Sequence, residues 1–279
     1  MGFIHANMVP ILKEHRVRPF SGRLLLLGQG DIYFSLDAYE RMAHVAGVNL
    51  DPAVAYRPSH IPQFAAKGYP HAETVFRKLG FSTISVLDYS AFEGAEIVFD
   101  LNLPAPPEAL RGAFDAVIDH GTLEHVFHFP NALNNLFQLL KVGGRAVISA
   151  PSGNFFDHGF YMFQPTLFLD FFTANGWTVN SLQVAQYTPN QETEPAFFTD
   201  YVPGMFSAVS YGKLDNKLYT TQCIVTKTAE STGDRVPQQG LYARMHGWSP
   251  PKNETPAPSG SPGGALGRLV GRALDQFKR

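Results

Sequence analysis

The chain has 279 residues, which is enough for one large domain or for one domain with additional segments. Hydrophobic residues make up 44% of it and charged residues 16%, a balance that excludes intrinsic disorder over most of the length. The formal net charge of −2 gives no overall attraction to nucleic acid or anionic lipid, and the single cysteine, Cys223, excludes an intramolecular disulfide framework and a thiolate zinc cluster.

The N-terminal segment, residues 1–22, is expected to stand apart from the main domain as a candidate lid. Its short apolar patch is interrupted by Lys13, Glu14 and Arg16, and it lacks the basic start, apolar middle and small-residue cleavage site of a signal peptide. No run of eighteen apolar residues occurs anywhere in the chain. We therefore expect a cytoplasmic protein.

The central part of the chain alternates apolar strands with amphipathic helices. The first strong strand is RLLLL at residues 23–27, a continuous apolar run typical of strands buried on both faces of a parallel sheet. Further strands are expected at 83–87, 96–99, 114–118, 145–150, 177–183 and 218–226, and helices at 36–46, 72–79, 131–140 and 164–175. This alternation predicts an α/β domain over residues 23–228 with a Rossmann-like, doubly wound, mostly parallel sheet.

Three segments fall outside this alternation. Residues 49–71 contain four prolines and no clear period, which predicts a loop. Residues 229–264 are rich in Pro, Gly and Ser and are expected to form a flexible linker. Residues 265–279 recover the periodicity of a basic amphipathic helix, which suits peripheral contact with a membrane or a partner; the interpretation we favour is a docking helix or a frayed terminus.

The residues just past each strand are the most informative, because ligands of an open parallel sheet bind outside the carboxyl ends of its strands. These residues are Gly28, Gln29 and Gly30, then Asp88 and Tyr89, then Asp100 and Leu101, then Asp119 and His120. Carboxylates in such places suit a ligand that offers hydroxyls, an exocyclic amine or positive charge. They suit a diphosphate badly, and Tyr33 replaces the third glycine of a dinucleotide-binding turn.

Three stretches carry a family resemblance. The segment FDAVIDHGTLEHVFHFPNALNNLFQLLKVGGRAVISAP, residues 114–151, is the most specific, and LLLLGQGD and SVLDYS agree with it. With these motifs residues 23–179 resemble the class I S-adenosylmethionine-dependent methyltransferases. The resemblance implies that fold and S-adenosylmethionine as the cofactor. It also implies an insertion around 49–71, near the cofactor end of the sheet, which is either a lid or substrate loop or a surface elaboration.

The resemblance assigns cofactor contacts to the strand ends. Gly28, Gln29 and Gly30 would lie beside the methionine portion, and Asp119 and His120 would lie nearby. Asp88 would accept from the ribose hydroxyls and Tyr89 would cover the adenine, while Asp100 and the Leu101 amide would bond the adenine edge. The alternative for both aspartates is turn formation or helix capping.

A general base helps methyl transfer to a hydroxyl, and histidine has a suitable pKa near neutrality. The candidates are His120, His125, Asp157 and His158; the last two lie in an aromatic-rich loop after the fifth strand. The alternative for each histidine is a structural role.

A metal site is the less favoured reading of the same region. Some similar O-methyltransferases use a Glu-His motif to bind a divalent cation, and Glu124, His125, His128 and His158 would be the ligands here. Those motifs carry a further glutamate where this chain has Gly121. We therefore expect no metal.

The acceptor is expected to be a hydroxyl of a glycan or a small-molecule metabolite, because aromatic loops suit a ring and no basic patch suits nucleic acid. The alternative function is a non-catalytic cofactor-binding or scaffold protein with the same fold. A nicotinamide-dependent oxidoreductase is disfavoured by Asp31 and Tyr33.

Overall fold

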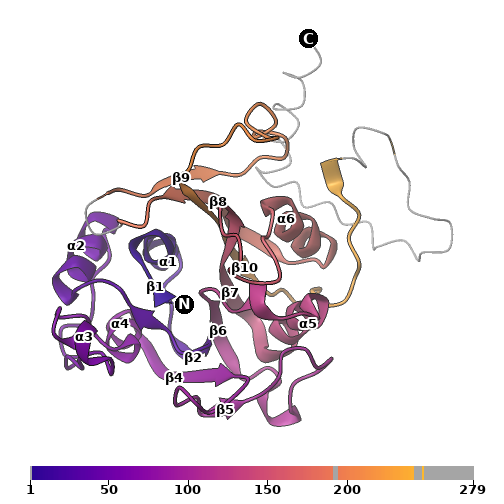
Figure 1. Cartoon of the computed structure of the whole chain (residues 1–279). Coiled ribbons are helices and arrows are strands. Elements are labelled where there is room, and N and C mark those ends of the chain that lie inside the picture. Colours follow the sequence, from indigo (N-terminus) through magenta and orange to yellow (C-terminus); the bar gives the residue numbers. More distant parts are fainter. Residues whose placement is uncertain (1, 191–193, 242–246, 248–279) are drawn as a thin grey trace.

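The computed structural model describes residues 2–190, 194–241 and 247. Within them, an eight-stranded sheet has the order β5-β4-β2-β6-β7-β10-β8-β9 (Figure 1). Its strands are β2 (Gly22–Leu27), β4 (Phe81–Asp88), β5 (Ile97–Val98), β6 (Phe114–Asp119), β7 (Leu140–Gly153), β8 (Thr178–Tyr187), β9 (Phe197–Asp200) and β10 (Leu218–Thr226).

The sheet is parallel from β5 to β7 and antiparallel beyond. β2 lies between β4 and β6, and β7 continues the parallel run on the far side of β6. β10 inserts antiparallel between β7 and β8, and β9 forms the antiparallel edge. The reversal of strand order on either side of β2 makes the sheet doubly wound, so the predicted Rossmann-like, mostly parallel α/β fold is confirmed.

Helices cover both faces of the sheet (Figure 1). They are α1 (His5–Val17), α2 (Leu36–Ala46), α3 (Pro62–Ala65), α4 (Ala72–Lys78), α5 (Phe129–Leu139) and α6 (Pro165–Ala174), with 3-10 turns η1 (Glu108–Leu110) and η2 (Leu123–His125).

Strand β2 shows why its sequence is continuously apolar. Leu25 and Leu27 pack into the core beneath α5 and α6, whereas Leu24 and Leu26 pack into the core beneath α1, α2 and α4. Successive side chains of a strand point to opposite faces, so a strand covered on both faces needs apolar residues at every position.

The N-terminal segment is built into the domain. Its first residues form β1 (Gly2–Phe3), which pairs in parallel with β3 (Asp31–Ile32) just after the glycine loop. Helix α1 then buries Met8, Ile11 and Leu12 in the core of that face. The predicted boundary at residue 23 is therefore not a break in packing.

A buried ion pair fixes the other end of α1. Arg145, at the amino end of the central part of β7, donates to Glu14 Oε1 at 2.9 Å and to the Pro19 carbonyl at 2.8 Å. Asn180 of β8 donates to the same Glu14 oxygen at 3.1 Å. The burial of Glu14 by itself raises the pKa of its carboxyl, but hydrogen bonds from Arg18 and Arg145 outweigh it and lower that pKa.

Two predicted loops take definite positions. In residues 49–71, Phe64 of α3 contacts Tyr33 with ring centroids 5.0 Å apart, and His60 lies 3.9 Å from Asp31, so this segment lies beside the glycine loop. The start of the predicted flexible linker is held against α6: Asn175 bonds Arg235 through both its amide atoms, and Trp177 donates to Thr232. Asn175 is buried, so its side-chain amide needs hydrogen-bond partners, and these bonds fix the path of the chain near Arg235.

The predicted helix at 265–279 lies outside the described residues. Among the residues that are described, no helix is both long and apolar enough to cross a membrane.

Replacement of Glu14 should test the α1 anchor. Glu14→Ala leaves the buried Arg145 without its charged partner, so the free energy of unfolding should fall by about 3 kcal/mol, measured by urea denaturation. The control is Glu108→Ala, whose side chain is 83% exposed in its pair with Arg111 and should change stability by less than about 1 kcal/mol. Equal effects of the two changes would show that the ion pair does not anchor α1.

Candidate functional site

The carboxyl ends of β2, β4 and β6 meet at one edge of the sheet. Leu27 is in register with Leu87 on one side and with Asp119 on the other. The next residue, Gly28, has φ +78°, and a Cβ there would lie 2.9 Å from Thr122 Oγ1 and 3.8 Å from Asp88 Oδ2. Glycine is required because the turn is left-handed and its neighbours approach closely.

Asp88 and Asp100 are half-buried at adjacent strand ends. Oδ1 of Asp88 accepts from the Ser90 amide at 3.3 Å, and Oδ1 of Asp100 accepts from the Asn102 amide at 2.9 Å. The turn-forming role considered for these residues is thus real. It occupies Oδ1 of each carboxylate, and Oδ2 takes no part in these turn hydrogen bonds.

The other cofactor candidates differ in exposure. Tyr89 is 73% exposed, whereas Leu101 is buried and its carbonyl accepts from Asn135 at 3.1 Å. Gln29 is half-buried and Gly30 is buried.

His120 is enclosed beneath the N-terminal strand. Its ring stacks on the fully buried Phe3 with centroids 4.4 Å apart, and both side chains close over Gly30. Burial lowers the pKa of His120 to about 3, although a hydrogen bond with the Gln29 backbone opposes this. A neutral imidazole with so low a pKa is a weak proton acceptor. Together with the stacking on Phe3, this favours a packing role for His120.

Asp119 holds the turn that follows β6. Its Oδ1 accepts from the Thr122 amide at 2.9 Å and from the Leu123 amide at 3.2 Å, which starts η2. Its Oδ2 is buried and has no hydrogen-bond partner among the described residues. Burial raises the pKa of Asp119 to about 7, against the lowering effect of these amides.

Glu124 on η2 is a second buried carboxylate. Its exposed fraction is 0%, and neither oxygen has a hydrogen-bond partner in the described part of the chain. Burial first, and the charge of Asp119 second, raise the pKa of Glu124 to about 8. Glu124 also affects Tyr187 at the end of β8, because burial and the charge of Glu124 both raise the pKa of Tyr187.

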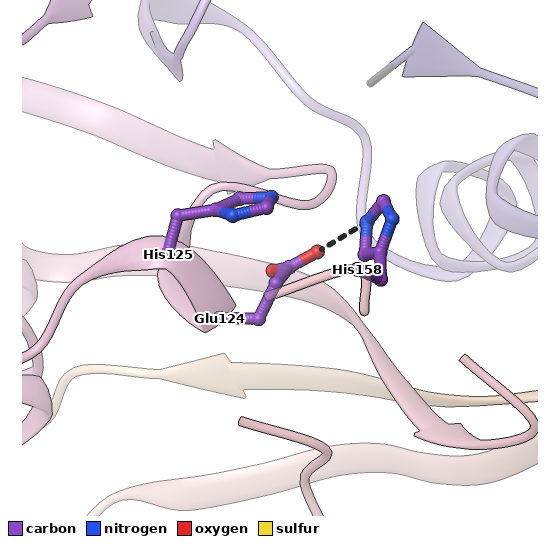
Figure 2. A group of neighbouring side chains, drawn as sticks. All are labelled: Glu124, His125 and His158. Carbon is purple, nitrogen blue, oxygen red and sulfur yellow. Dashed lines mark ion pairs between the residues drawn. The ribbon is translucent and has the colours of Figure 1, made fainter. Parts of the chain in front are cut away.

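The loop after β7 packs on Glu124. Phe160 donates its amide to the Glu124 carbonyl at 2.9 Å, and a Cβ at Gly159 would lie 2.9 Å from that carbonyl. Figure 2 shows the result: His125 and His158 flank the Glu124 carboxylate. Nε2 of His158 lies 3.5 Å from Glu124 Oε1, and the two imidazole centroids are 5.2 Å apart.

The structure thus unites three of the four residues considered as metal ligands. His128 instead begins α5 with an exposed side chain and is not part of this cluster. Asp157 is exposed with φ 60°, next to His158.

Three residues at the site were not predicted from the sequence: Phe3, Thr122 and Tyr187. Thr122 donates to the Leu27 carbonyl at 2.7 Å and so ties η2 to the glycine loop. Its position next to the Leu-Glu-His motif was a usable signal. Phe3 and Tyr187 approach the site through distant strands, and nothing local in the sequence marks them.

Two surface hollows lie away from this edge. One, of about 600 Å³, lies between α5 and the segment after β10, lined among others by Arg111, Phe137 and Lys227. The other, of about 540 Å³, lies on the exposed face of α2. Neither holds a cluster of perturbed titratable groups, so the strand ends remain the better candidate site.

Comparisons with known proteins bear on the fold. No protein-family model and no curated protein matches the chain. Among solved structures, an S-adenosylmethionine-dependent methyltransferase from Thermotoga maritima is 15% identical over 77% of this chain and 87% of its own, with a TM-score of 0.34. One from Archaeoglobus fulgidus is 10% identical over 78% and 94%, with a TM-score of 0.38.

A third match is the 1,6-didemethyltoxoflavin-N1-methyltransferase of Burkholderia thailandensis, solved with 1,6-didemethyltoxoflavin and S-adenosylhomocysteine. It is 13% identical over 79% of this chain and 76% of its own, with a TM-score of 0.32. All three similarities are remote. The class of the fold, a Rossmann-like, doubly wound α/β sheet, is therefore read from the strand order itself.

The neutral state of His120 predicts a pH effect on stability. Its pKa of about 3 in the fold lies below the unfolded value of about 6.5, so its contribution is full above pH 6.5 and is lost as pH falls toward 3. At pH 5 the loss should be about 2 kcal/mol. The free energy of unfolding of His120→Gln should therefore fall less between pH 7 and pH 5 than that of the unaltered protein.

His128→Gln is the control, because that side chain is exposed. An unaltered pH slope in His120→Gln would mean that the fold does not lower the pKa of His120.

Proposed function

We propose that the chain is an S-adenosylmethionine-dependent methyltransferase that methylates a hydroxyl of a glycan or a small-molecule metabolite. The observation that carries the proposal is the arrangement at the sheet edge. A left-handed glycine turn with the Asp88 carboxylate beside it lies at the point where the strand order reverses. Ligands of doubly wound sheets bind at such switch points.

The cofactor fits the charges of this edge. Oδ2 of Asp88 is available to the ribose hydroxyls and Oδ2 of Asp100 to the adenine amino group, because Oδ1 of each is held by its own turn. Charge-assisted hydrogen bonds of this kind contribute about 1.5–3 kcal/mol each. The methionine portion would lie along Gly28, Gln29 and Gly30, next to Asp119, and carboxylates there suit a sulfonium and an amine better than a diphosphate.

The acceptor would bind on the side of η2 and the loop after β7. His158 is the preferred base of the four candidates, because it is partly exposed and its Nε2 lies 3.5 Å from the Glu124 carboxylate. Burial lowers the pKa of His158, which keeps the imidazole neutral and able to take a proton near pH 7. Phe156 and Phe160 are 89% and 66% exposed beside it and offer apolar faces to a ring.

The reaction at this site is a direct displacement. The acceptor oxygen attacks the methyl carbon of the sulfonium, the carbon–sulfur bond breaks, and S-adenosylhomocysteine leaves with the electron pair. The hydroxyl proton goes to His158. The protein mainly aligns acceptor and methyl group.

The first test is calorimetric titration with S-adenosylhomocysteine, with NAD as the control ligand. We expect one site of micromolar affinity for S-adenosylhomocysteine and no heat from NAD. Binding of neither ligand would favour the non-catalytic scaffold function, and binding of NAD would favour an oxidoreductase.

Asp88→Ala should weaken S-adenosylhomocysteine binding at least tenfold in the same titration, because the ribose loses its charged acceptor. Glu230→Ala, which removes an exposed carboxylate, is the matched control and should bind normally. Unchanged affinity in Asp88→Ala would exclude the ribose assignment.

A further inference from the structure

The cluster of Glu124, His125 and His158 has the composition of a metal site. One ligand atom from each residue lies within 4.8 Å of the other two, and all three side chains turn toward the same point (Figure 2). Two come from η2 and the third from the loop after β7, so residues more than thirty positions apart are brought together by the fold.

Glu124 is the second, independent observation. It is fully buried, and neither carboxylate oxygen accepts a hydrogen bond from the described residues. Nε2 of His158 lies 3.5 Å from Oε1. A buried carboxylate without hydrogen bonds is costly, and such groups in folded proteins are usually paired or coordinate a metal ion.

We propose that Glu124, His125 and His158 bind a divalent first-row transition-metal cation. Two imidazoles and one carboxylate suit zinc or ferrous iron, whereas magnesium and calcium prefer sites made of oxygen ligands alone. The sequence alone favoured no metal here, because Gly121 replaces the further glutamate of the similar motifs.

The geometry requires only small movements. Bonds of about 2.1 Å place neighbouring ligand atoms roughly 3 to 3.5 Å apart. The Glu124–His158 separation of 3.5 Å is already at that limit. His125 is exposed on η2, so its ring can make the small shift toward the other two ligands, while Phe160 and Gly159 hold the His158 loop against Glu124.

Three protein ligands leave coordination positions for water or for an oxygen of another molecule. If the proposed function holds, that oxygen is the acceptor hydroxyl: the cation would fix its position beside the methyl group and would lower the pKa of the hydroxyl. That role would replace the one given to His158 as the base, because a coordinated imidazole nitrogen has no free lone pair. Both statements rest on the proposed function, whereas metal binding itself does not.

The test uses the whole protein, stripped with a chelator and titrated with Co²⁺ alone while visible absorption is recorded. We expect one equivalent to bind and to give the d–d bands of an ion with nitrogen and oxygen ligands; a Zn²⁺ titration by calorimetry should give the same stoichiometry. Glu124→Gln and His158→Ala should each weaken binding at least tenfold. His128→Ala removes a nearby exposed histidine outside the cluster and should bind normally.

Circular dichroism of each variant shows whether it is folded, and Glu124→Gln preserves the shape of the buried side chain. Absence of stoichiometric binding to the unaltered protein would overturn the proposal, as would full binding by Glu124→Gln or a loss in His128→Ala equal to that in His158→Ala. S-adenosylhomocysteine binding is measured separately, so failure of the metal site and failure of the proposed function are distinguishable.

Discussion

The site depends on how Asp119 ends strand β6. One of its oxygens accepts two backbone amides and starts η2, so the carboxylate that closes the strand also determines where Glu124 and His125 lie. Thr122 ties the same turn to the end of β2. The consequence is electrostatic: both carboxylates are buried, and the charge of Asp119 raises the pKa of Glu124 further. A proton can relieve the cost of burying these charges, and so can a bound cation.

The N-terminal segment links the two ends of the sheet. At the amino end, Arg145 and Asn180 hold Glu14 on α1; at the carboxyl end, β1 pairs with β3 and places Phe3 against His120 and Gly30. Helix α1 therefore connects the buried Glu14–Arg145 ion pair at one end of the sheet to the glycine loop at the other. Phe3 lies over Gly30 and His120 as part of the packed domain. A lid function for this segment stays a prediction.

The two halves of the site differ in character. On the side of β4 and β5, Asp88 and Asp100 are accessible carboxylates fixed by their own turns, which suits a polar cofactor. On the side of β6 and β7, Glu124 is enclosed and is flanked by the imidazoles of His125 and His158, which suits the cation proposed for this cluster. The division follows the switch in strand order at β2.

Local pattern was sufficient for the sheet and for the residues at its strand ends. The apolar run of β2 and the helical spacing of α5 are consequences of burial on two faces and on one face, and both periodicities can be read without a structure. The union of Glu124 with His158, the enclosure of His120 by Phe3 and the ion pair of Glu14 with Arg145 could not be read in this way. Each joins residues far apart in the chain, and only the packing of loops and helix α1 against the finished sheet decides which of many polar side chains share a buried space.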